Sequence, residues 1–150
     1  IENGATTLWE HWAFSDNTFS HNHPMFGMVV EWFYNAIAGI RPQADAIGFD
    51  KIIIKPEPVQ GLTWAKATYN SIHGQVSCSW KKEGDNFQMD VHIPVNASAT
   101  IYMPAIDAEQ VTESGRATSE STGLKFVRME KNRAIYNATA GTYSFKSSDF

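Results

Sequence analysis

The stretch FQMDVHIP, residues 87–94, alternates apolar and polar side chains from Phe87 to Ile93. Side chains along a β-strand point in turn to the two faces of its sheet, so the apolar residues of this stretch share one face. They are Phe87, Met89, Val91 and Ile93. We expect that face to be buried and the opposite face to be in water, as in an antiparallel sheet covered on one side.

Further strands are expected on both sides of this stretch. They are KIIIKP at 51–56, WAKATYN at 64–70, GQVSCSWKK at 74–82, SATIYMP at 98–104, KFVRME at 125–130, RAIYNAT at 133–139 and TYSFKS at 142–147. Turn residues such as Gly61 and the run EGDN at 83–86 separate them. Short strands with hairpin turns and no helical pattern between them favour an antiparallel β-sandwich. The polar stretch 107–122 is expected to be a long loop or a weak edge.

The chain has a different pattern before about residue 44. From Met25 to Ile40 apolar residues recur at spacings of three and four, which predicts a helix with a wide apolar face. Pro24 suits the first turn of such a helix, and Gly39 followed by Pro42 suits its end.

The aromatic content before residue 44 points to a larger domain. Eight aromatic residues lie there, more than one helix and a loop can bury. We therefore expect residues 1–44 to be the last part of a helical domain. Residues 45–150 are long enough to form a β-domain with its own core.

Composition excludes several classes of protein. The chain is 43% hydrophobic and 19% charged, as is typical of globular proteins, and its net charge of -4 with no basic block argues against nucleic acid as a partner. No run of about 18 apolar residues is present, so no segment is expected to span a membrane. Cys78 is the single cysteine, which excludes an internal disulfide framework; its alternation with Val76 and Trp80 predicts a core position.

Trp64 and Trp80 are the two tryptophans of the β half. A β-sandwich with an aromatic face can bind carbohydrate, although a fold alone does not establish a function. Both tryptophans alternate with small or apolar neighbours, which favours core positions for them over a sugar platform.

The stretch ATTLWEHW, residues 5–12, places one carboxylate, Glu10, among two tryptophans and a histidine. A carboxylate shielded from water by indole rings has its neutral form favoured, which raises its pKa toward the range of general acid–base catalysis. The alternative is that Glu10 is a surface acid and the tryptophans belong to a core.

The stretch SHNHP, residues 20–24, allows three interpretations. His21 and His23 are candidate metal ligands, but a zinc site needs three or four ligands and no third has a fitting spacing. Alternatively, Ser20 or Asn22 caps the helix and both histidines are exposed. In the third interpretation one imidazole, held at the start of the helix, donates a hydrogen bond to a ligand hydroxyl.

Four motifs, taken in order, point to a family. They are TTLWEHW at 6–12, SHNHPMFGMVVEWFYNAIAGI at 20–40, GFDKIIIKP at 48–56 and LTWAKATYNSIHGQVSCSWK at 62–81. Together they resemble the C-terminal region of bacterial α-L-rhamnosidases, which are inverting glycoside hydrolases. The resemblance implies a mainly β chain: an antiparallel β-sandwich preceded by the last helix or helices of an (α/α)6 catalytic toroid.

The resemblance also implies roles for four residues. Glu10, in the Trp-Glu motif, corresponds to the proposed general base, and His23 to a histidine of the sugar-binding site. Trp9 and Trp12 would form or support an aromatic wall. No metal or cofactor is implied, because the mechanism needs only carboxylates and water.

The family's general acid lies upstream of the motifs present here. An inverting glycosidase needs two carboxyl groups on opposite sides of the scissile bond, so these 150 residues are expected to be inactive alone. The expected partners are a rhamnose-containing glycan and the remainder of the catalytic domain. Without that remainder, the apolar face of the helix is expected to associate with a second copy or to fold onto the β-domain. The alternatives are a carbohydrate-binding module and the same architecture acting on a different glycoside.

Overall fold

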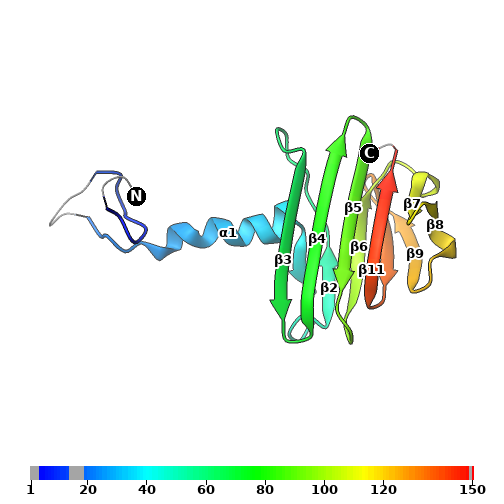
Figure 1. The fold of residues 1–150 in the computed structure, drawn as a ribbon, viewed down its shortest axis with the longest axis horizontal. Coiled ribbons are helices and arrows are strands. Elements are labelled where there is room, and N and C mark those ends of the chain that lie inside the picture. The colour runs from blue at the N-terminus through cyan, green and yellow to red at the C-terminus, as the bar shows by residue number, and fades with distance from the viewer. Residues whose placement is uncertain (1–3, 14–18, 149) are drawn as a thin grey trace. The chain divides into compact units, whose positions relative to one another are not determined.

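The computed structural model describes residues 4–13, 19–148 and 150. The chain divides into two compact units, one ending at Phe33 and the other beginning at Tyr34. The second unit is a β-sandwich, drawn as arrows in Figure 1, and the predicted fold class is confirmed.

A helical segment runs through the boundary between the two units and changes its winding twice. It consists of a 3₁₀ turn, η1 (Pro24–Met28), the α-helix α1 (Val29–Trp32) and a π-helical turn, η2 (Phe33–Ile37). Pro24 lies in its first turn as expected. The helix predicted to reach Ile40 ends instead at Ile37.

One sheet of the sandwich has five strands in the order β1-β2-β6-β10-β9. They are β1 (Ile40–Pro42), β2 (Lys51–Ile54), β6 (Ser98–Pro104), β10 (Arg133–Ala138) and β9 (Leu124–Met129). Ile40 pairs with Ile54 of β2, so the sheet begins before the change of pattern at residue 44. An apolar residue three positions after Ile37 suits a helix and a strand equally, which is why the pattern did not reveal the end of the helix.

The other sheet has six strands in the order β3-β4-β5-β11-β7-β8 and faces the viewer in Figure 1. They are β3 (Trp64–Ser71), β4 (Gly74–Glu83), β5 (Asn86–Ile93), β11 (Gly141–Ser147), β7 (Val111–Glu113) and β8 (Arg116–Ala117). The short 3₁₀ turn η3 (Ala108–Gln110) precedes β7, and the 3₁₀ turn η4 (Thr118–Glu120) follows β8. The stretch 107–122 is therefore the weak edge of a sheet rather than a loop.

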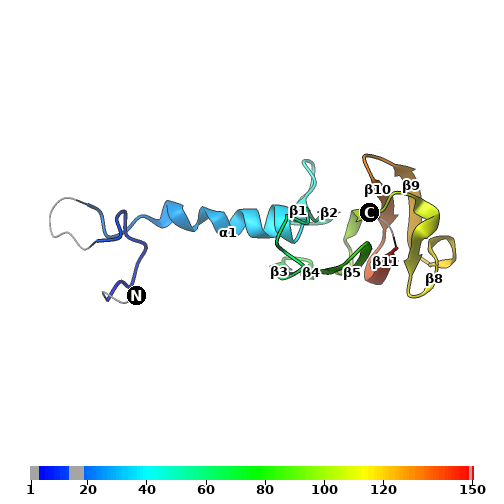
Figure 2. The ribbon, with the colours of Figure 1, turned by 90° about the horizontal axis from the view of Figure 1, so that it is seen from above.

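One strand pair departs from the predicted antiparallel pattern. β2 and β6 pair in parallel, with Ile52 opposite Ala99 and Ile54 opposite Ile101. Parallel neighbours need a long crossover connection. Here the connection between β2 and β6 runs through the strands β3, β4 and β5 of the opposite sheet. Figure 2 shows the two sheets edge-on.

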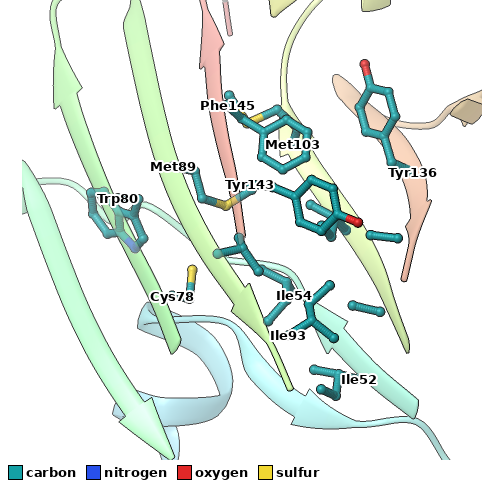
Figure 3. Close-up of a cluster of buried hydrophobic side chains, with 14 of the residues drawn as sticks. Ile52, Ile54, Cys78, Trp80, Met89, Ile93, Met103, Tyr136, Tyr143 and Phe145 are labelled. Atoms are coloured by element: carbon teal, nitrogen blue, oxygen red, sulfur yellow. The ribbon is translucent and has the colours of Figure 1, made fainter. Parts of the chain in front are cut away.

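The core lies between the two sheets (Figure 3). The predicted face of β5 is buried, since Phe87, Met89, Val91 and Ile93 are each no more than 1% exposed. Cys78 is also fully buried, as predicted from its alternation with its neighbours on β4. Burial raises the pKa of the Cys78 thiol to about 12, so the lone cysteine stays a neutral core residue.

The two tryptophans of the sandwich lie on opposite faces of their sheet. Trp80 is a core residue, 3% exposed, and its Nε1–H donates a hydrogen bond of 2.7 Å to the carbonyl of Ile37. Trp64, predicted to be a core residue as well, is 65% exposed. In β3 it is Ala65, opposite Trp80, that faces inward, so Trp64 points to solvent.

Gly39 makes the turn from the helical segment into β1. Its φ is +77°, in the region that strongly favours glycine. The Gly39 carbonyl accepts a hydrogen bond of 2.9 Å from the N–H of Lys55. A Cβ at Gly39 would overlap the carbonyl carbon of Lys55 and the nitrogen of Pro56, so no other residue fits without displacing that segment.

We expect Gly39→Ala to lower the free energy of unfolding by about 1–2 kcal/mol for the left-handed backbone. A further loss of about 1–3 kcal/mol is expected from the overlap with the Lys55–Pro56 backbone. Urea unfolding followed by circular dichroism measures the loss. Gly61→Ala is the matched control, because Gly61 has a φ of +89° but no atom near its would-be Cβ. Equal losses in the two variants would show that the close approach at Gly39 is unimportant.

Candidate active site

The first unit holds Glu10 and His23 on two neighbouring backbone segments. The N–H of His23 donates to the carbonyl of Leu8 at 2.6 Å, and the N–H of Glu10 donates to the carbonyl of Ser20 at 2.9 Å. The Leu8 side chain also packs at Gly27, where its Cδ1 lies 3.6 Å from the position of a would-be Cβ. These contacts bring together the two stretches that the sequence analysis singled out.

The Glu10 carboxylate is held at one oxygen and directed at His23 by the other. Its Oε2 accepts a hydrogen bond of 2.9 Å from the backbone N–H of Ser20. Its Oε1 lies 3.8 Å from Nε2 of His23, a separation that suits an ion pair but is too long for a hydrogen bond. The Glu10 side chain is 42% exposed, so water reaches the carboxylate.

The imidazole of His23 is more enclosed than the carboxylate it faces. Its side chain is 20% exposed, and its ring stacks on Phe26 with the ring centroids 5.5 Å apart. Nδ1 is buried and has no hydrogen-bond partner among the described residues. The ring is thus fixed by packing, with Nε2 turned toward Glu10.

The two tryptophans beside Glu10 lie in unlike environments. The ring of Trp9 packs against His21, with centroids 4.9 Å apart. Trp12 is 97% exposed, so its indole does not shield Glu10 from water among the described residues.

The turn before the helix does not follow the capping interpretation. The residue at the N-cap is His23, and no side chain caps the helix there. Ser20 and Asn22 instead bond to each other: the Ser20 hydroxyl donates to the Asn22 carbonyl at 3.3 Å and accepts from the Asn22 N–H at 3.1 Å. This local turn orients the Ser20 N–H that holds Glu10.

Two contributors to the site were missed by sequence reasoning. Ser20 acts through its backbone N–H, which no residue type reveals. Phe26 lies three residues after His23, and that spacing, which brings side chains together on a helical turn, was a usable signal.

The described residues contain no group of three or more His, Cys, Asp or Glu side chains placed to hold a metal ion. None of the described helices is long and apolar enough to cross a membrane. What the first unit offers chemically is a solvent-accessible carboxylate, fixed by the main chain, next to an imidazole that can donate a hydrogen bond.

Comparison with known families places both units. Residues 1–37 match the family model described as the bacterial alpha-L-rhamnosidase 6 hairpin glycosidase domain. Residues 39–118 match the model of the bacterial alpha-L-rhamnosidase C-terminal domain. The chain belongs to the bacterial α-L-rhamnosidase family.

Individual relatives agree with this assignment. An α-L-rhamnosidase of Streptomyces avermitilis is 33% identical over 153 residues, which cover 97% of this chain and 14% of the relative. The crystal structure of a Streptomyces avermitilis α-L-rhamnosidase complexed with L-rhamnose matches with a TM-score of 0.80 at 32% identity, over 97% of this chain and 14% of that one. The structure of α-L-rhamnosidase from Dictyoglumus thermophilum matches with a TM-score of 0.78 at 38% identity, over 97% and 16%. The chain thus spans about one-seventh of the length of these relatives.

Proposed function

We propose that these 150 residues are the C-terminal part of a longer α-L-rhamnosidase that hydrolyses terminal α-L-rhamnosyl linkages with inversion. Residues 1–44 would end its (α/α)6 catalytic domain and residues 45–150 would form its C-terminal sandwich. Two observations favour moving that boundary to Gly39. Strand β1, which begins at Ile40, already pairs with β2 of the sandwich, and one family model ends at residue 37 while the other begins at residue 39.

The observation that carries the proposal is the oriented carboxylate of Glu10. In an inverting reaction one carboxylate takes a proton from water as that water attacks the anomeric carbon. The bond to the leaving oxygen breaks on the opposite side, and that oxygen takes a proton from a second carboxyl group. Glu10 suits the role of base, because the Ser20 N–H fixes Oε2 and leaves Oε1 of this partly exposed side chain to accept the proton.

His23 suits a binding role beside that base. As a neutral imidazole it can donate a hydrogen bond from Nε2 to a sugar hydroxyl, and in its charged form it would attract the ionised carboxylate of Glu10 and hold it in place. The stack on Phe26 holds the ring in place for either task. We assign Trp9 and Trp12 to the aromatic wall of the sugar site. The exposed indole of Trp12 would complete that wall only with further parts of the catalytic domain.

Glu10→Gln in the longer protein should reduce kcat on an aryl α-L-rhamnoside by several orders of magnitude, since the amide cannot take the proton. The amide oxygen still accepts from the Ser20 N–H, so the fold is preserved. Steady-state kinetics over a panel of aryl glycosides measures the loss and the sugar preference.

The matched control is Glu109→Gln, an exposed acid of the sandwich, which should leave kcat unchanged. Unchanged turnover in Glu10→Gln would remove Glu10 from the mechanism. Preference for another glycoside would keep the architecture and overturn the assigned substrate.

The helical segment presents an apolar surface that supports the assignment to a larger domain. Its exposed large apolar side chains are Met25 at 57%, Phe26 at 51%, Met28 at 66%, Val29 at 50%, Val30 at 51%, Trp32 at 48% and Phe33 at 49%. Exposed apolar patches of this kind mark surfaces that pack against a partner. We propose that the remainder of the catalytic domain covers this helical surface in the longer protein, and that a second copy covers it when these residues are produced alone.

The 150-residue chain should therefore form a homodimer and show no hydrolysis of an aryl rhamnoside. Multi-angle light scattering measures its mass. Changing Met28 and Trp32 together to Glu should give a monomer, because charged residues oppose burial of the helical surface. A matched pair on the sandwich, Ile72→Glu with Val95→Glu, should leave the dimer intact, as these exposed residues lie elsewhere. A monomeric wild-type chain, or turnover by it, would contradict the proposal.

A further inference from the structure

Trp64 occupies an unusual position on the outer face of the six-stranded sheet. It is the first residue of β3, pairs with Lys81 of β4 and is 65% exposed. A tryptophan is among the side chains that gain most from burial, and exposed aromatic groups of this size often take part in binding. At this level of the sheet Ala65, Trp80 and Met89 face the core, so Trp64 contributes nothing to the packing between the sheets.

A shallow hollow of about 160 Å³ lies beside this indole. Its polar lining comes from three adjacent strands and consists of Lys66, Ser79, Lys81, Gln88 and Asp90. Cross-strand pairing arranges the outward side chains in two rows, Trp64–Lys81–Gln88 and Lys66–Ser79–Asp90. The hollow thus has one aromatic wall, with hydrogen-bonding groups around it.

The polar groups of the hollow are positioned and nearly balanced in charge. Oδ1 of Asp90 accepts a hydrogen bond of 2.7 Å from the hydroxyl of Ser144. Lys81 forms an ion pair with Glu83 in which both side chains are 58% exposed, so the pair is weak and open to exchange. Lys66 and Lys81 face Asp90 in the lining, Glu83 pairs with Lys81, and Lys146 of β11 lies opposite Gln88, so the surroundings of the hollow are within one charge of neutral.

This combination fits a neutral pyranose ring. One face of such a ring consists of C–H groups that can lie on an indole, and its rim consists of hydroxyls that both donate and accept. The lining offers ammonium donors, a carboxylate acceptor, and an amide and a hydroxyl that do both. A hollow well below the roughly 300 Å³ of an ordinary ligand pocket suits one ring rather than a long segment. A protein partner would need several apolar anchors, whereas the groups around Trp64 are polar.

We propose that the outer face of β3, β4 and β5 is a sugar-binding site in which Trp64 stacks on one neutral pyranose unit of a glycan. Such a site holds a polymeric substrate on the protein and requires no hydrolysis. It therefore stands or fails separately from the role proposed for Glu10.

The test is an NMR titration of the 150-residue chain that follows the indole N–H signal of Trp64, assigned by its loss in Trp64→Phe. The probes are methyl α-L-rhamnopyranoside, methyl β-D-glucopyranoside and the charged methyl β-D-glucuronopyranoside. We expect a neutral probe to shift this signal with a Kd on the order of 1 mM, as for a single weakly held ring. The signal is local, so binding near Glu10 does not contribute to it.

Variants separate stacking from hydrogen bonding, with affinity followed by calorimetry where the indole signal is removed. Trp64→Ala should weaken binding at least tenfold, Trp64→Phe and Gln88→Ala should weaken it less, and Ile72→Ala, an exposed apolar control, should not change it. Circular dichroism checks that each variant is folded. The proposal is overturned if no neutral probe shifts the signal, if Trp64→Ala binds as wild type, or if the glucuronoside binds more tightly. It is also overturned if the signal moves with protein concentration instead, which would mark a contact between copies.

Discussion

The close approach of the backbone at Gly39 is the constraint on which the rest of the sandwich depends. There the chain leaves the helical segment with a positive φ, and its carbonyl is bound by the Lys55 N–H. The next residue, Ile40, can then pair with Ile54, which starts the five-stranded sheet. Just before the turn, the carbonyl of Ile37 accepts the buried Trp80 N–H. Because a helix end leaves such carbonyls unsatisfied, this bond ties the last helical turn to the core.

Much of this fold was predictable from the sequence, because apolar and polar residues alternate along most of its strands and turn residues separate them. Three features were not. The parallel pairing of β2 with β6 joins strands more than 40 residues apart and leaves no local pattern. Ile40 fits the spacing of a helix as well as that of a strand. In WAKATYN both faces carry apolar residues, so only the pairing with β4 shows that Ala65, rather than Trp64, faces the core.

The candidate site shows the same division between local and distant information. The motifs identify Glu10 and His23, but their mutual orientation arises from backbone bonds between segments ten or more residues apart. The N–H of Ser20 that holds the carboxylate belongs to the main chain, so this hydrogen bond cannot be predicted from the type of residue at position 20. Under the proposed function, the exposed Trp12 would be covered by further parts of the catalytic domain, which no pattern in these 150 residues can reveal.

Chemical rescue tests whether Glu10 takes the proton from an attacking water. Glu10→Ala in the longer protein removes the base, and azide, an anion that attacks without losing a proton, can replace the activated water. If Glu10 has this role, azide should restore cleavage of an activated aryl α-L-rhamnoside, and NMR should identify the product as the inverted β-L-rhamnosyl azide. No rescue, or an azide product of retained α configuration, would contradict it.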